Sequence, residues 1–91
     1  MYITGVKYLK NYILHVTFKN GLVKDFNFKD FLFTETNPMF TKFRSINLFK
    51  KVRAENGLLI WGDDEMDFLG EHLFLLEKES KKAGKRKEAV I

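Results

Sequence analysis

The sequence predicts a small α+β fold, in which two hairpins form an antiparallel sheet with short helices packed on one face and a helix at the C-terminal end. Three observations predict it. Two Asn-Gly pairs, Asn20-Gly21 and Asn56-Gly57, each separate two strand-like runs of apolar residues, as in β-hairpins. Asn37-Pro38 is a typical helix start. Leucines at helical spacing follow Asp67.

The first hairpin has a register that its apolar pattern defines. The strand-like runs that open the chain cover residues 6–9, 12–18 and 22–28. Matching the apolar faces of the last two runs pairs Leu14 with Phe26 and Phe18 with Leu22. This register needs a three-residue loop, in which we expect Gly21 to take the left-handed conformation.

The segment between the hairpins combines turns with one predicted helix. Residues 28–33 break the strand alternation, so we expect a short helical turn there, followed by a polar connector over 34–36. With Asn37 as the N-cap, the next helix runs from Pro38 to about Ser45. We expect its buried side to carry Met39, Phe40 and Phe43.

The second hairpin joins residues 51–55 to 58–61. A two-residue turn at Asn56-Gly57 pairs Ala54 with Leu59 and Val52 with Trp61, which keeps these four side chains on one face.

The last predicted element is a helix from Phe68 to about Glu79, with Asp67 as its N-cap. Its apolar stripe comprises Leu69, Leu73 and Leu76, and we expect His72 to be partly buried beside them. Residues 1–79 then form a single α+β domain, and the basic tail over 80–91 is expected to be disordered because it contains few apolar residues.

Composition narrows the class of protein. A chain of 91 residues is the size of one domain, and its ten Phe residues predict an aromatic core. The absence of Cys excludes disulfides, thiolate catalysis and Cys-ligated zinc. No apolar stretch is long enough to span a membrane, and the start lacks a signal-peptide pattern. We therefore expect a cytoplasmic protein with no membrane association.

The net charge of +4 is concentrated at one end of the chain. Residues 1–77 hold ten Lys and Arg against ten Asp and Glu, so the predicted folded body is neutral. A basic cluster of this kind binds nucleic acid phosphates through counterion release, although charge runs are often only solvated ends. The candidate nucleic-acid-binding residues are Lys78, Lys81, Lys82, Lys85, Arg86 and Lys87.

A set of short motifs gives a family resemblance over roughly residues 3 to 77. In order, the motifs are Phe18-x-Asn20-Gly21, Phe49-x-x-Val52, Leu58-x-x-Trp61, Asp67-Phe68 and Leu73-Phe74. Together they resemble the uncharacterised bacterial family called domain of unknown function 2442. Gly62 and Gly70 depart from the family pattern, which usually has Pro after the Trp and Pro or an acidic residue at the start of the last helix.

The resemblance implies a small α+β domain without an established activity, found alone or fused to a helix-turn-helix module. It also implies that some stand-alone members are components of toxin–antitoxin-type gene pairs. We expect no helix-turn-helix module in this chain, because little sequence follows the last helix. The DNA-binding function of fused members is therefore not carried over.

Catalytic and metal-binding patterns are weak. His15 and Asp25 face each other in the predicted hairpin register, as a general base and its orienting carboxylate do, but the sequence places no nucleophile beside them. An exposed cross-strand polar pair is the ordinary explanation for them. The acidic run from Asp63 to Asp67 lacks the spacing of an EF-hand loop and is better explained as a solvated turn. We therefore expect no enzymatic activity, cofactor or metal.

The sequence favours a non-enzymatic domain that binds a protein partner or a second copy of itself. The family resemblance implies that this binding takes place within a toxin–antitoxin-like or regulatory pair. The candidate contact residues are Tyr8 and Tyr12 on the first sheet edge and Trp61 at the end of the second hairpin. Of the two explanations for Trp61, the sequence favours a core position, because it is the largest residue of the hairpin. Nucleic-acid binding through the basic tail is the alternative function.

Overall fold

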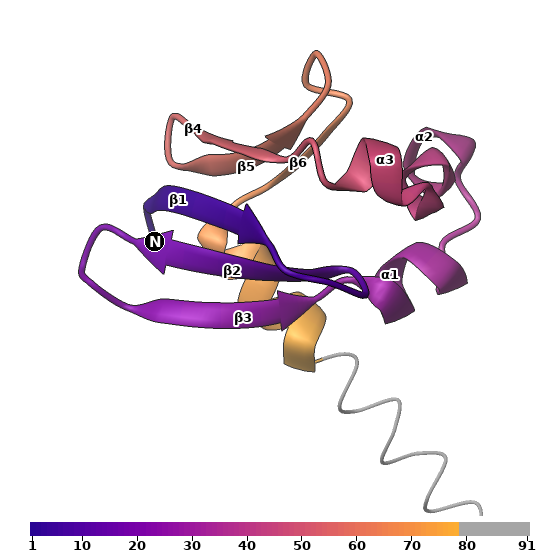
Figure 1. The fold of residues 1–91 in the computed structure, drawn as a ribbon. Coiled ribbons are helices and arrows are strands. Elements are labelled where there is room, and N and C mark those ends of the chain that lie inside the picture. The colour runs from indigo at the N-terminus through magenta and orange to yellow at the C-terminus, as the bar shows by residue number, and fades with distance from the viewer. Residues whose placement is uncertain (79–91) are drawn as a thin grey trace, which may run out of the picture.

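The computed structural model describes residues 1–78, which form strands, short helices and a C-terminal helix over 70–78 (Figure 1). This arrangement confirms the predicted α+β class. The elements before that helix are β1 (Ile3–Tyr8), β2 (Ile13–Phe18), β3 (Val23–Asn27), α1 (Lys29–Thr34), α2 (Pro38–Thr41), η1 (Lys42–Arg44), α3 (Ile46–Phe49), β4 (Arg53–Glu55), β5 (Leu58–Trp61) and β6 (Met66–Phe68).

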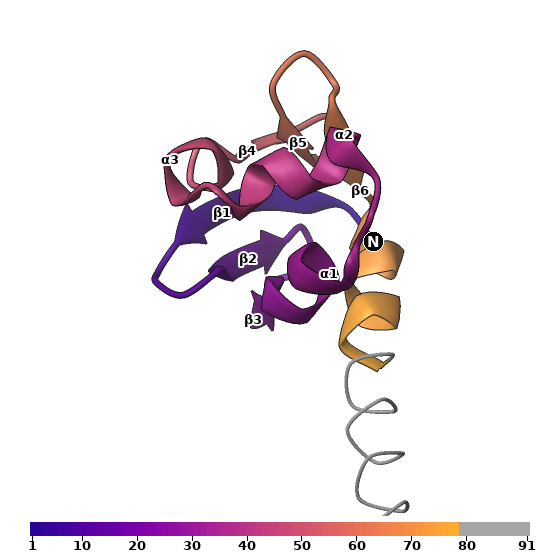
Figure 2. The same ribbon diagram turned by 90° about the vertical axis from the view of Figure 1, so that its right-hand side faces the viewer.

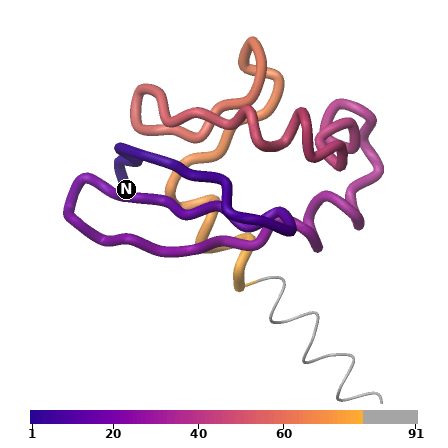
Figure 3. The backbone as a smooth tube through the Cα atoms, in the orientation of Figure 1, coloured from indigo at the N-terminus to yellow at the C-terminus, as the bar shows by residue number. Residues whose placement is uncertain are grey.

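The strands lie in two three-stranded antiparallel sheets, not in the single sheet that the sequence suggested. The first sheet has the order β1-β2-β3 and the second has the order β4-β5-β6. Figure 3 shows β1 running between β2 and the hairpin of the second sheet. In residues 1–78, one isolated bridge joins the sheets, where the Ile3 N–H donates to the Gly57 carbonyl at 3.1 Å.

The first hairpin has the predicted register. Leu14 lies opposite Phe26 and His15 lies opposite Asp25. Gly21 has a φ of 93°, which is the left-handed conformation that the three-residue loop requires. The apolar pattern alone therefore selected the correct pairing of these strands.

The second hairpin also forms as predicted. Ala54 lies opposite Leu59, and Asn56 and Gly57 both have positive φ, 53° and 81°. Two positive φ values are the signature of a type I′ turn, whose twist matches that of the strands it connects.

One face of the first sheet is covered and the other is open in the described part of the chain. Figures 1 and 2 show the C-terminal helix crossing the face of this sheet that points away from the viewer of Figure 1. Its Phe74 ring lies 5.9 Å from the Phe18 ring and 5.3 Å from the Phe26 ring, centroid to centroid. Lys24 and Glu77 form an ion pair at 2.8 Å that fixes the helix to β3.

The core is built from aromatic rings, as composition predicted. Trp61 is fully buried and lies against Phe28, Phe43, Phe49 and Phe68 at centroid distances of 5.7 to 6.2 Å. These rings come from the second sheet, from the residue that follows β3 and from the helical segment between the sheets. The buried aromatic cluster therefore joins parts of the chain that the backbone ladders leave separate.

The helical segment after Asn37 differs from the single helix predicted over 38–45. The Asn37 side chain caps it as expected, because its Oδ1 accepts from the Met39 N–H at 3.0 Å. After Thr41, however, the chain tightens into the 3₁₀ turn η1, which turns about 120° per residue instead of about 100°. This shift leaves Met39 outside the apolar face, so its predicted burial is wrong: Met39 is 55% exposed, while Phe43 is buried.

The C-terminal helix begins later than predicted. Asp67 is not its N-cap, because it lies in β6 opposite Ile60, and the helix starts at residue 70. The His72 Nδ1 accepts from the Leu69 N–H at 3.2 Å. The N3 side chain of a capping box accepts from the N-cap N–H in the same way. His72 and Leu69 are therefore exposed rather than buried, whereas Leu73 is buried as predicted.

Gly57→Ala is expected to destabilise the protein more than Gly21→Ala. Both glycines have positive φ, which costs another residue about 1–2 kcal/mol. A Cβ at Gly57 would also lie 2.6 Å from the Tyr2 ring, whereas nothing lies within 4 Å of a Cβ at Gly21. Urea unfolding of both variants measures the difference.

The extra cost at Gly57 should disappear when Tyr2 is replaced by Ala, since the ring then no longer occupies the space of the new methyl group. A double-mutant cycle tests this dependence. Equal losses for Gly57→Ala in the two backgrounds would contradict the packing of Tyr2 on Gly57.

Candidate partner-binding surface

Trp61 belongs to the core and has no exposed surface in the structure. Its indole Nε1–H donates to the Phe49 carbonyl at 2.8 Å, and its ring stacks on the Phe49 ring at 5.7 Å. Trp61 therefore has the core position that the sequence favoured.

Tyr8 and Tyr12 are half-buried and contact the helical segment. The Tyr8 ring meets the Phe49 ring edge-on at 5.9 Å. Tyr12 lies in the turn before β2, with a φ of 65°, and its hydroxyl donates to the Arg44 carbonyl. Much of each tyrosine is thus used for internal packing, and partner contact through them stays a prediction.

Arg44 connects η1 to the end of α1, a role that the sequence did not predict. Its Nε donates to the Leu32 carbonyl at 2.6 Å and its Nη2 donates to the Glu35 carbonyl at 2.8 Å. The guanidinium lies 5.3 Å from the centre of the Phe33 ring. These contacts satisfy carbonyls at the end of α1, and no local pattern in the sequence marks Arg44 for this role.

The outer edge of β3 carries backbone groups that no strand of residues 1–78 pairs. In the first sheet, β3 pairs with β2 on one side and with no strand of residues 1–78 on the other (Figure 1). The Phe18 N–H donates to the Leu22 carbonyl at the end of the hairpin. Because hydrogen-bonded pairs alternate along an antiparallel ladder, the N–H and C=O groups of Val23, Asp25 and Asn27 point away from β2. We call these three residues the β3 edge.

A polar row crosses the open face of the first sheet beside the β3 edge. Lys7 lies opposite His15, and His15 lies opposite Asp25. The His15 Nδ1 is 2.6 Å from the Asp25 Oδ1, with the two side chains 42% and 53% exposed. The contact orients the Asp25 carboxylate. Both side chains remain open to solvent on the face of the sheet.

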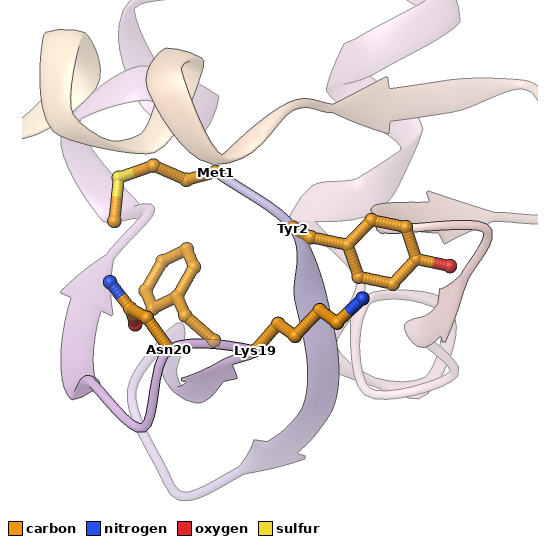
Figure 4. A pocket seen from close by; sticks show the side chains of 5 residues that line it. Met1, Tyr2, Lys19 and Asn20 are labelled. Carbon is orange, nitrogen blue, oxygen red and sulfur yellow. The ribbon is translucent and has the colours of Figure 1, made fainter.

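A small pocket of about 260 Å³ lies at the end of the first sheet where β1 begins and β2 ends (Figure 4). It is lined by Met1, Tyr2, Phe18, Lys19 and Asn20. Catalysis by His15 and Asp25 would need a cavity that holds both residues, and neither residue lines this one. The catalytic hypothesis therefore gains no geometric support from the pocket.

The N-terminus is fixed beside this pocket by an ion pair. The Met1 ammonium donates to the Glu71 Oε1 at 2.8 Å. This hydrogen bond, a hydrogen bond from the backbone and the positive charge of the ammonium hold the pKa of the Glu71 carboxyl below its ordinary value.

The acidic run forms a hairpin turn between β5 and β6. The Glu65 N–H donates to the Trp61 carbonyl at 3.1 Å, and the Glu65 carboxylate pairs with Lys42. Within residues 1–78, no three His, Asp or Glu side chains gather closely enough to hold a metal ion.

The basic cluster lies almost wholly outside the described residues. Lys78 is exposed at the end of the described helix. The other five candidates, Lys81, Lys82, Lys85, Arg86 and Lys87, follow it beyond residue 78. Nucleic-acid binding by this tail stays a prediction. None of the helices in residues 1–78 has the length and apolar character of a membrane span.

Comparison with known families gives one assignment. The model of the family described as protein of unknown function (DUF2442) matches residues 3–78. The chain belongs to this family. The match confirms the resemblance found from the sequence motifs and covers both sheets and the helix over 70–78. No curated protein and no solved structure matches the chain, so membership in DUF2442 assigns no activity.

Trp61→Phe is expected to lower the free energy of unfolding of this DUF2442 domain by about 2–4 kcal/mol. The substitution removes ring volume from the core and the indole hydrogen bond to the Phe49 carbonyl. Urea denaturation measures the loss. Tyr2→Phe is the control, because Tyr2 is 54% exposed and should change stability by no more than about 0.5 kcal/mol. Equal stability of the two variants would contradict a core role for Trp61.

Acetylation of the N-terminus is expected to raise the pKa of Glu71 towards its ordinary value, because it removes the positive charge. A carboxyl with a lowered pKa stabilises the fold above its unfolded-state pKa, and this contribution is lost as the pH falls through the folded-state pKa. NMR titration of the Glu71 side chain measures the pKa. An unchanged pKa after acetylation would show that the ion pair is absent in solution.

Proposed function

We propose that this DUF2442 domain is a non-enzymatic bacterial interaction module, which binds a protein partner by adding a strand to the β3 edge. The proposal places the domain in a regulatory pair of the toxin–antitoxin kind. The observation that carries it is the row of outward backbone groups on β3, which no strand of residues 1–78 satisfies. Such a row is a template for an extended segment of another chain.

The β3 edge lacks the devices with which proteins commonly block exposed strands. It has no Pro, and its register with β2 runs without a bulge. Strand β3 has two charged residues, Lys24 and Asp25, and both pair with other parts of the fold. Lys24 pairs with Glu77 and lies over the Phe26 and Phe74 rings, and Asp25 reaches back to His15. An unprotected edge of this kind favours strand pairing.

The aromatic residues that the sequence suggested as partner contacts are less suitable than the β3 edge. Trp61 is buried, and Tyr8 and Tyr12 pack against the helical segment. The near-neutral balance of charge in residues 1–77 suits a protein partner better than nucleic acid. Nucleic-acid binding through the basic tail remains the alternative, and it depends on residues beyond those the structure describes.

Val23→Pro is expected to weaken partner capture about three- to tenfold, because it removes an outward N–H donor and places a ring at the edge. The substitution is compatible with the sheet, since Val23 is the first residue of β3 and its N–H does not bond to β2. The assay is quantitative pulldown from native bacterial extract with the full chain.

Val23→Thr is the matched control, because it keeps the β-branched shape and the N–H. We expect it to capture the partner as the original chain does. Equal capture by Val23→Pro and Val23→Thr would reject the β3 edge. Failure of the original chain to recover any stoichiometric partner would count against the proposed function itself.

A further inference from the structure

The side-chain chemistry of the β3 edge identifies the kind of segment that it fits. On the open face, Asp25 stands at the centre of the edge with Val23 and Asn27 on either side. Val23 is 46% exposed and uncharged, and Asp25 carries the one charge among the three. A strand added here would place its side chains directly opposite these positions, with Cα atoms about 5.5 Å apart in a hydrogen-bonded pair.

The Asp25 carboxylate has capacity left for a second contact. Its Oδ1 bonds to the His15 Nδ1 at 2.6 Å, and 53% of the Asp25 side chain stays exposed to solvent. Because His15 lies on β2, the carboxylate is supported from inside the sheet while its other side faces the edge. The contact with His15 therefore orients the Asp25 carboxylate before a Lys or Arg side chain of an added strand binds to it.

A second copy of this chain is a poor occupant. The two-fold antiparallel register that pairs all three edge residues with one another is centred on Asp25. That register sets two Asp25 carboxylates directly opposite each other, and like charges in cross-strand pairs are destabilising. A strand with Lys or Arg at the same position replaces this repulsion by an attraction.

We propose that the β3 edge binds an antiparallel extended segment of a partner protein that carries Lys or Arg opposite Asp25 and an apolar residue, two positions further along, opposite Val23. This inference rests on the proposed function and adds the chemistry of the partner segment. Charge complementarity at Asp25 sets the register of the segment, and the outward backbone groups of the edge bind any extended chain.

The test uses the full chain and immobilised peptides in which Thr and Val alternate on either side of a central Lys, Gln or Glu. We expect the Lys peptide to bind about fivefold more tightly than the Glu peptide, with Gln between them, because each cross-strand charge pair contributes up to about 1 kcal/mol. Asp25→Lys should invert this order, and Asp25→Asn should abolish it without changing the shape of the side chain.

Asp63→Lys is the matched control, since it makes the same charge change at an exposed position in the β5–β6 turn. The preference for Lys should persist in this variant. The inference would be overturned if the Asp25→Lys variant still preferred the Lys peptide, or if the three peptides bound equally. Dimerisation of the chain through β3 would also overturn it.

Two further measurements separate this inference from the proposed function. Amide hydrogen exchange by NMR should show that Val23, Asp25 and Asn27 become protected when the Lys peptide binds. If the chain captures a stoichiometric partner from extract while these amides stay unprotected and Asp25→Lys has no effect, the inference fails and the proposed function stands. If neither a partner nor a peptide binds, both fail.

Discussion

The fold depends on the burial of one indole at the place where its three parts meet. Trp61 comes from the second sheet, Phe28 follows the first sheet, and Phe43 and Phe49 come from the helical segment. The hydrogen bond from the indole to the Phe49 carbonyl fixes the orientation of the ring and satisfies a buried backbone acceptor. With so little backbone pairing between the sheets, aromatic packing has to hold them together.

The parts of the fold that the sequence predicted are those decided by local chemistry. Asn56-Gly57 can adopt two positive φ values in succession, and Asn37 followed by Pro38 suits a capped helix start, whatever surrounds them. The pairing of Leu14 with Phe26 was also accessible, because a shift of one residue would have exposed the whole apolar face.

The errors have two causes, which are a distant partner that outweighs the local preference and a local change of helical pitch. Asp67 has the chemistry of an N-cap, yet Met66–Phe68 completes the second sheet by pairing with β5. Met39 fits an apolar stripe only if the helix keeps its α-helical pitch, and the change to a 3₁₀ turn after Thr41 removes that condition. The outward direction of the β3 edge could be derived from the predicted hairpin, but its lack of a neighbouring strand could not.

The candidate surface differs from the one suggested by residue type. Aromatic residues suggested a binding role for Tyr8, Tyr12 and Trp61, but in a chain this short those rings are needed for the core. The surface that remains is made of backbone groups with a single charge at its centre. In a family without an assigned activity, a surface of this kind is visible only when strand order and register are known.

The bridge between Ile3 and Gly57 joins positions near the beginning of the chain to positions beyond its middle. During synthesis, β1, β2 and β3 can pair as soon as they leave the ribosome, because their connections are short. The apolar side of that sheet stays uncovered until Trp61 and the last helix have also emerged. We therefore expect the closing of the core to be a late, non-local step of folding, during which the first sheet exposes surface that the finished protein hides.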